Sequence, residues 1–334
     1  MATAPQPPSD PSIGPPSWPT PPDPAPASAP QGAIHPLSFG RALNVGWSLY
    51  RYRWRAMLGV AAVFMGPAYL VAAMLNVAYG ESFLRWQRDL LPRFGQQPPQ
   101  LAELVPWDAL ALALLSSVLL GLGAALAAAA IVHLVGWTYG GGRPSAAQVI
   151  ARTVARVPSL LGGMLIATLV LMSALIGGAA LVAIVVAVGG GGLTIFLALL
   201  VAVSMVAVAI LLTARWALLS QAIMLDGRGA VGALGRSWRL VLGSTWRVIG
   251  YIVGLALIGL PFSLAAGAVA TVLFGTGIDW RTLEPVWDPL ASAAQVVAAG
   301  VAVWLVQPFA AAVMTLLYYD LRLKQGERLA PPAG

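Results

Sequence analysis

Six long apolar stretches dominate this chain, and short polar connections separate them. They cover Met57–Tyr79, Trp107–Tyr139, Leu160–Val188, Leu193–Gln221, Val248–Phe274 and Pro289–Tyr318. Each exceeds the roughly 20 residues that a helix needs to cross a hydrocarbon core about 30 Å thick. Because backbone groups in lipid must hydrogen-bond within their own segment, the pattern predicts an all-α integral membrane bundle of six transmembrane helices.

The third and fourth stretches are separated only by Gly189 to Gly192. The apolar run from Leu160 to Gln221 is too long for a single crossing. Four consecutive glycines supply the backbone freedom that a tight turn requires. The pattern therefore predicts a transmembrane hairpin with a very short loop.

A basic amphipathic segment precedes each odd-numbered stretch. The three segments are Ser38 to Trp54, Ser145 to Val157 and Ala230 to Trp246. In the first, polar and basic residues recur at spacings of three and four, and Leu43 and Trp47 lie on the other face. This periodicity predicts three cytoplasmic-side interfacial helices, each followed by a hairpin. It also predicts three tandem parallel repeats, at about 37–139, 144–228 and 229–322.

Positive charge is distributed unequally between the two sides. Fifteen Lys and Arg residues flank the stretches on one side, and the other side has Arg85, Arg88, Arg93 and Arg281. The positive-inside rule then places both termini in the cytoplasm. We expect a multi-pass protein of the cell (inner) membrane, and the strong preference for Arg over Lys suggests a GC-rich bacterial genome.

The composition excludes a soluble domain of ordinary proportions. Charged residues make up 9% of the chain, hydrophobic residues 59%, and the mean hydropathy is +0.81, whereas soluble domains are about one quarter charged. The net charge of +7 is compatible with nucleic acid, but the arginines lie beside the apolar stretches. Anionic membrane lipids are therefore the expected partners, with a membrane protein as a further candidate and nucleic acid excluded.

The first 36 residues contain thirteen prolines and neither Lys nor Arg. Proline fixes φ and removes a backbone donor, which disfavours a packed core. We predict a disordered cytoplasmic tail over 1–36, a six-helix domain over 37–328 and a short cytoplasmic tail over 329–334. The proline-rich tail is interpreted as a spacer, with a polyproline ligand for a partner domain as the alternative.

The sequence contains no constellation that indicates catalysis. General acid and base chemistry needs clustered titratable groups, but the two histidines, His35 and His133, have no grouped acids nearby in the sequence. Cysteine is absent, which removes thiol catalysis and thiolate metal sites. Zinc, P-loop and serine-hydrolase motifs are absent as well. We predict no catalytic residue, no cofactor and no metal.

A few polar residues within or beside the stretches are candidates for structural roles: His133, Asp226, Asp320 and Arg322. His133 lies inside the second stretch and is interpreted as a neutral imidazole hydrogen-bonded to a neighbouring helix, with a proton relay as the alternative. The triplets Asp226-Gly227-Arg228 and Asp320-Leu321-Arg322 end the fourth and sixth stretches. Residues two apart on a helix do not face each other, so we expect each aspartate to meet an arginine of an interfacial helix, such as Arg236 or Arg239.

Three motifs carry a resemblance to a known family. They are Gln221-Ala222-Ile223-Met224-Leu225-Asp226-Gly227, Ala233-Leu234-Gly235-Arg236-Ser237-Trp238-Arg239-Leu240 and Leu316-Leu317-Tyr318-Tyr319-Asp320-Leu321-Arg322. With them, the region from about Pro36 to Arg328 resembles the bacterial membrane-domain family named after glycerophosphoryl diester phosphodiesterase, and related multi-pass proteins of unknown function. In the members that give the family its name, a soluble phosphodiesterase domain follows the membrane region. The sequence continues for only a few residues past the sixth stretch, to Gly334, so we expect a membrane module without that activity.

Two functions remain open from the sequence. The first is a non-enzymatic inner-membrane module that organises lipid or protein partners through its basic interfacial helices. The alternative is a transporter or channel with a substrate path between the repeats. Candidates for lipid or interface contacts are Arg51, Arg53, Arg55, Arg152, Arg156, Arg236, Arg239, Trp47, Trp54, Trp238 and Trp246.

Overall fold

The computed structural model describes residues 38–90, 105–139, 142–189, 191–274, 277–279, 284–286 and 288–327. The predicted tails over 1–36 and 329–334 lie outside these residues. Six long helices form the described part: α1 Phe39–Leu90, α2 Trp107–Tyr139, α3 Ala146–Val188, α4 Gly192–Trp216, α7 Thr245–Phe274 and α8 Pro289–Lys324. Two short helices, α5 Leu219–Met224 and α6 Ala230–Val241, lie between α4 and α7.

The six predicted stretches correspond to six candidate spans that are long and apolar enough to cross a membrane. The fourth stretch is not one helix as predicted, because α4 ends at Trp216 and α5 begins at Leu219. The hairpin between α3 and α4 is confirmed, and Gly191 has the positive φ, 85°, that favours glycine in such a turn. The chain is not wholly helical, because β1 Gly277–Asp279 pairs with β2 Glu284–Val286 in the α7–α8 connection. These strands are too short to produce a readable alternation of polar and apolar residues, so the sequence did not reveal them.

All three amphipathic segments are largely helical. The first is continuous with α1 but is set off by a kink at Arg53 (φ −122°, ψ 22°). The second opens α3 with a capping box, in which Ser145 and Gln148 hydrogen-bond to each other's backbone N–H. The third is α6, which ends at Val241, so Trp246 belongs to α7 and not to this segment as predicted. Gly243, at φ 84°, lies in the turn between α6 and α7. The interfacial position and the threefold repeat stay predictions.

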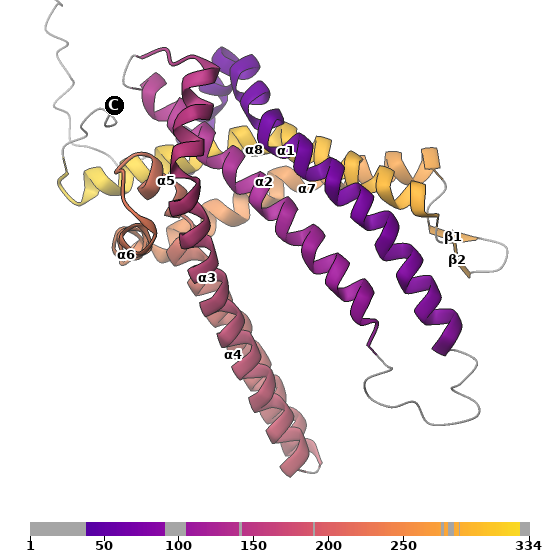
Figure 1. Cartoon of the computed structure of the whole chain (residues 1–334). Coiled ribbons are helices and arrows are strands. Elements are labelled where there is room, and N and C mark those ends of the chain that lie inside the picture. The colour runs from indigo at the N-terminus through magenta and orange to yellow at the C-terminus, as the bar shows by residue number, and fades with distance from the viewer. Residues whose placement is uncertain are drawn as a thin grey trace, which may run out of the picture. The chain divides into compact units, whose positions relative to one another are not determined.

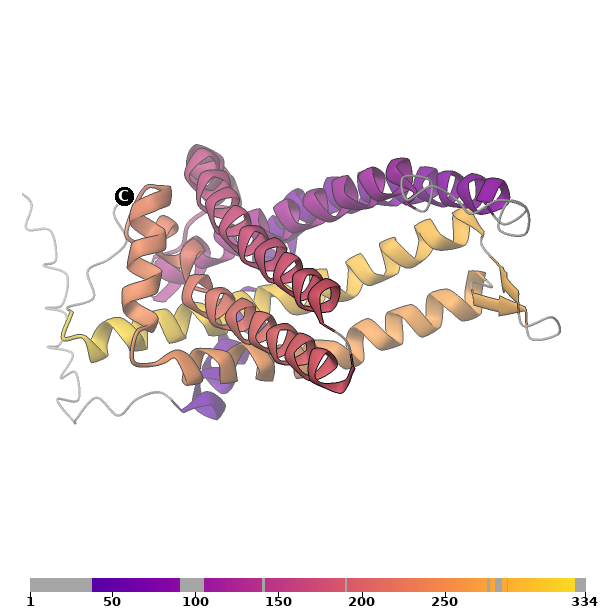
Figure 2. The ribbon, with the colours of Figure 1, turned by 90° about the horizontal axis from the view of Figure 1, so that it is seen from below.

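Helices α1, α2 and α8 pack against one another, and α7 packs along α8, as Figures 1 and 2 show. Glycines permit the close approaches. A Cβ on Gly123 of α2 would lie 2.6 Å from the methyl group of Ala68 on α1, and one on Gly46 of α1 would lie 2.6 Å from a methyl group of Val313 on α8. Met57, Met65 and Ile131 are fully buried in the α1–α2–α8 core.

The α3–α4 hairpin diverges from these helices (Figure 1). No residue in the most apolar window of either helix is buried. Large apolar side chains such as Ile176, Ile195 and Phe196 are more than half exposed. Such an apolar surface is typical of helices that face lipid tails.

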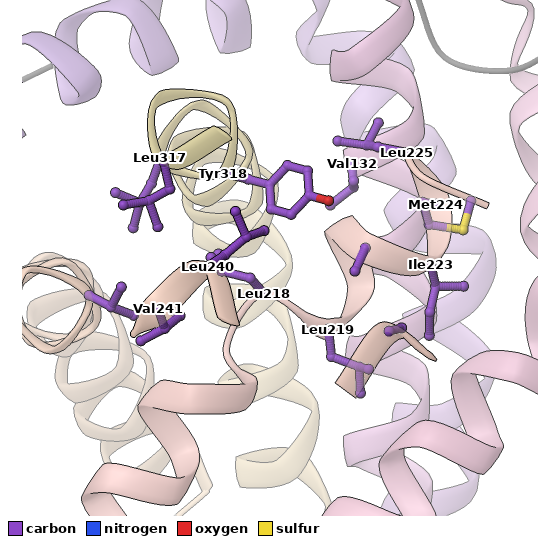
Figure 3. Packing of buried hydrophobic residues seen from close by; sticks show 14 of the residues in the cluster. Val132, Leu218, Leu219, Ile223, Met224, Leu225, Leu240, Val241, Leu317 and Tyr318 are labelled. Atoms are coloured by element: carbon purple, nitrogen blue, oxygen red, sulfur yellow. The ribbon is translucent and has the colours of Figure 1, made fainter. Parts of the chain in front are cut away.

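The largest hydrophobic core lies where α5 and α6 meet α2 and α8. Figure 3 shows Leu218, Ile223 and Leu240 directed into this core together with Tyr318 of α8. Full burial of a leucine or isoleucine side chain stabilises a fold by about 1.5–3 kcal/mol. This core therefore fixes α5 and α6 against the long helices and positions the charged groups described next.

Candidate functional site at the basic end of the bundle

One end of the bundle, named here the basic end, contains most of the charge. Helices α1, α3 and α7 begin there, α2, α4 and α8 end there, and α6 lies there (Figure 2). Its described residues include fourteen Arg and Lys side chains but three carboxylates, which belong to Asp226, Asp320 and Glu327. Positive charge at this end therefore far exceeds what these carboxylates can neutralise.

Asp226, Arg236, Glu327 and Arg322 form a closed ring of ion pairs. The two oxygens of Asp226 accept hydrogen bonds from Nε of Arg236 and Nη1 of Arg322, each at 3.1 Å. Glu327 closes the ring by accepting from Nη2 of Arg236 and, at 2.9 Å, from Nε of Arg322. The ring ties the α5–α6 connection, α6 and the end of α8 together.

Two glycine turns place the carboxylates of this ring. Gly227 has a φ of 67°, and its carbonyl oxygen accepts a hydrogen bond from Nη1 of Arg156 at 3.0 Å. Gly326 has a φ of 77°, and the next amide, of Glu327, donates to the carbonyl oxygen of Arg322 at 3.1 Å. Glycine at the end of a helix commonly permits such a return of the chain. The second turn brings Glu327 to the two arginines.

Two pKa values in the ring are displaced from their ordinary values. The hydrogen bond from Arg236 lowers the pKa of Glu327, partial burial opposes this effect, and Arg322 adds to the lowering. Burial by itself lowers the pKa of Arg236, but its hydrogen bond to Glu327 and its interaction with Tyr318 raise the pKa overall. Both shifts favour the charged forms of Glu327 and Arg236.

The sequence predicts one contact of this ring. The expected pairing of Asp226 with Arg236 is confirmed. Nε of Arg228 also lies 3.8 Å from a carboxylate oxygen of Asp226, which differs from the expectation that residues two apart do not face each other. That expectation holds for a helix, whereas the triplet follows the end of α5 and is not helical. Glu327 was not identified, since its position depends on the turn at Gly326.

Asp320 forms a second ion pair at the basic end. Asp320 is 2% exposed, and its carboxylate accepts a hydrogen bond from Nη1 of Arg247 at 2.5 Å. The prediction of an arginine partner is correct, but the partner belongs to α7 and not to an interfacial helix. Arg322, the other charged member of the Asp320 triplet, pairs with Asp226 and Glu327 instead.

The predicted lipid-contact arginines occupy different environments. Arg51, Arg55 and Arg239 are exposed, and Arg53, Arg152 and Arg156 are half-buried. Nη1 of Arg53 lies 3.5 Å from the carbonyl oxygen of Pro144. Arg236 differs from the prediction because it is 9% exposed and held in the ring. It is therefore removed from the residues that can reach a lipid headgroup.

All four predicted interface tryptophans expose much of their surface, and Trp246, at 82%, exposes the most. Arginine guanidinium groups lie over two of these tryptophan rings: Arg55 over Trp54 at 5.3 Å, and Arg215 over Trp238 at 5.0 Å. Arg215 was not among the predicted site residues, because it lies in the apolar fourth stretch. Exposed indole rings are typical of the headgroup level of a membrane.

His133 is buried on α2, with its ring 6.1 Å from that of Trp137. Its Nδ1 has no hydrogen-bond partner among the residues that the structure describes. The predicted hydrogen bond to a neighbouring helix is therefore not made by this atom.

A comparison with curated proteins finds no match, and a comparison with solved structures finds none either. Residues 94–321 match the model of a family described as a domain of unknown function, DUF7847. This match names no activity, so the resemblance to the phosphodiesterase-associated membrane family stays a prediction from the sequence motifs. The match covers α2 through most of α8, including the ion-pair ring except Arg322 and Glu327. The chain belongs to the DUF7847 family.

Proposed function

We propose that this protein is a non-enzymatic membrane module whose basic end gathers anionic lipids. The observation that carries this proposal is the charge imbalance there, fourteen basic side chains against three carboxylates. All three carboxylates are already engaged by arginines. Anionic headgroups supply the missing negative charge, and each basic side chain near such a surface contributes on the order of 1 kcal/mol.

Polar groups inside the long helices support a packed module more than a transport path. Nε1 of Trp304 donates to the carbonyl oxygen of Leu58 at 2.9 Å, and Nε2 of Gln307 donates to that of Ala124. These bonds join α8 to α1 and α2, as is common for polar residues in membrane helices. The pocket between α1 and α8, of about 330 Å³, is lined mainly by apolar and aromatic residues, including Met65, Tyr69 and Trp304.

A transporter or channel is the second candidate, and it rests on two buried atoms. Oε1 of Gln307 and Nδ1 of His133 have no hydrogen-bond partner among the described residues. Buried polar atoms without partners are costly and can mark a path for water or protons. If protons enter vesicles that contain the wild-type chain but do not enter vesicles that contain the Gln307→Leu variant, the result would favour this candidate over the module.

The proposed orientation places the basic end in the cytoplasm, in agreement with the positive-inside rule. Reporter fusions test it directly. Fusions after Gly142, Gly229 and Gly334 should report the cytoplasm, whereas fusions after Gln97 and Trp280 should report the opposite side. The reversed pattern would refute the orientation and, with it, the contact between the basic end and the cytoplasmic leaflet.

Lipid gathering is tested by purifying the full chain from membranes and quantifying the retained lipid at increasing salt. We expect phosphatidylglycerol to be enriched over zwitterionic lipid, and the enrichment to fall with salt as surface charges are screened. Arg55→Gln, at an exposed residue of the basic end, should reduce the enrichment. Arg85→Gln removes the same charge from an exposed residue near the other end of α1 and should leave the enrichment unchanged. Equal retention in all three proteins, independent of salt, would contradict the proposal.

A further inference from the structure

A cationic pocket of about 550 Å³ lies between the end of α4, the α6–α7 connection and the end of α8. Its lining consists of Leu211, Arg215, Gly243, Ser244, Thr245, Trp246, Arg247 and Lys324. Arg215, Arg247 and Lys324 come from three different helices, and the lining contains no carboxylate. Its volume is in the range of ligand-binding pockets, about 300–1,000 Å³.

The two arginines are positioned by neighbours outside the pocket lining. Asp320, which is buried and does not line the pocket, accepts the 2.5 Å hydrogen bond from Arg247. The guanidinium of Arg215 lies over the ring of Trp238, and its Nη1 is buried with no hydrogen-bond partner among the described residues. A buried N–H donor without an acceptor is costly, so an anion that reached Arg215 would remove this cost.

The start of α7 adds further groups that favour an anion. The carbonyl oxygen of Ser244 accepts the first hydrogen bond of α7, from Val248 N at 3.1 Å. The amides just after such a residue have no acceptor within the helix, and the helix dipole is positive there. The first turn of α7 contains no acidic residue. The hydroxyl group of Ser244 can supply an additional donor, whereas that of Thr245 donates to the carbonyl oxygen of Val241 at 3.3 Å.

We propose that this pocket binds the phosphate of an anionic glycerolipid. The inference rests on the proposed function and names one site for it. Phosphate is the shared chemistry of lipid headgroups and soluble phosphates, and the surroundings favour the lipid. Trp246 is 82% exposed at the pocket, and on α4 the exposed side chains of Val208 and Leu211 are three residues apart, on one face that continues from the pocket. This face can accommodate an acyl chain, whereas a soluble phosphate would not use it.

Lys324 makes the pocket directly testable, because it is the single lysine of the chain and is exposed. The rate at which an amine-reactive reagent modifies Lys324 is measured by mass spectrometry on the full chain in detergent, in a buffer without phosphate. Phosphatidylglycerol, phosphatidylcholine and inorganic phosphate are added separately. We expect phosphatidylglycerol to slow the modification strongly, and the other two to have little effect.

Arg215→Gln should weaken the protection, so that about ten times more phosphatidylglycerol is required. The matched control, Arg51→Gln, removes the same charge from an exposed residue of the basic end that does not line the pocket, and it should retain full protection. If Arg215→Gln fails to fold, Lys324→Gln replaces it, with phosphatidylglycerol affinity measured by native mass spectrometry. A loss on the order of tenfold is expected, and an unchanged affinity would overturn the site.

The remaining outcomes separate this site from the general proposal. Salt-sensitive enrichment of phosphatidylglycerol without protection of Lys324 would refute the pocket and leave the proposed function standing. The absence of both would refute both. Equal protection by inorganic phosphate would show that the pocket takes a soluble phosphate, which overturns the assignment to a lipid.

Discussion

Replacement of Asp226 by asparagine removes the more buried of the two carboxylates in the ion-pair ring while preserving the size of the side chain. Asp226 accepts from both Arg236 and Arg322 at 3.1 Å, and after the replacement both guanidinium groups depend on Glu327. The side chains of the two arginines are 11% and 14% exposed, so water can compensate them only in part. We expect Asp226→Asn to lower the free energy of unfolding substantially.

The magnitude follows from the burial of the ring. Removal of one partner from a fully buried ion pair costs about 3–5 kcal/mol, because the other charge is left uncompensated. Glu327 still contacts both arginines, so we expect about 3 kcal/mol, the lower end of this range. Glu327→Gln should cost about 1 kcal/mol, the upper limit for exposed pairs, since the Glu327 side chain is 30% exposed.

The assay is denaturant unfolding of the purified full chain in mild detergent at neutral pH, monitored by tryptophan fluorescence. Glu81→Gln, at an exposed carboxylate outside the basic end, is the matched control and should leave the unfolding midpoint unchanged. The double variant with Asp226→Asn and Glu327→Gln should differ from the sum of the single effects, because both residues share two arginines. If Asp226→Asn lowers the free energy of unfolding no more than Glu327→Gln does, the ring is not the main electrostatic contribution to stability at the basic end.

Other predictions concern pH and packing. The pKa of Glu327 is below its ordinary value of 4.5, so its ionised form stabilises the folded state above pH 4.5. This contribution disappears as the pH falls through the lowered pKa. The difference in unfolding free energy between the wild type and Glu327→Gln should therefore shrink when unfolding is measured at increasingly acid pH. Gly123→Ala should destabilise the α1–α2 contact by about 1–3 kcal/mol. Gly121→Ala, two residues away with open space around its Cβ position, should not lower the free energy of unfolding in the same assay, because alanine favours a helix more than glycine does. Trp304→Phe should cost about 1 kcal/mol, because it removes the hydrogen bond from α8 to α1, and an unchanged midpoint would contradict that bond's contribution.

The six long helices could be predicted from the sequence because their cause is local. A segment that is apolar over the width of a bilayer satisfies its own backbone as a helix, whatever its neighbours are. The same reasoning identified the α3–α4 turn, where Gly191 adopts a positive φ. The amphipathic helices followed from a periodicity of three to four residues, which is equally local. The concentration of arginine at one end followed from counting alone.

The pairing of the charges was decided by the tertiary structure. The spacing of residues in the sequence places Arg236 on a basic face of its helix. In the structure Arg236 is buried and paired with two carboxylates from other parts of the chain, so it is not available to a lipid. Glu327 and Arg215 acquired their surroundings in the same way, through a glycine turn in one case and the ring of Trp238 in the other. The physical reason is that helix formation depends on neighbours within one or two turns, whereas an ion pair or a pocket depends on residues that only folding brings together.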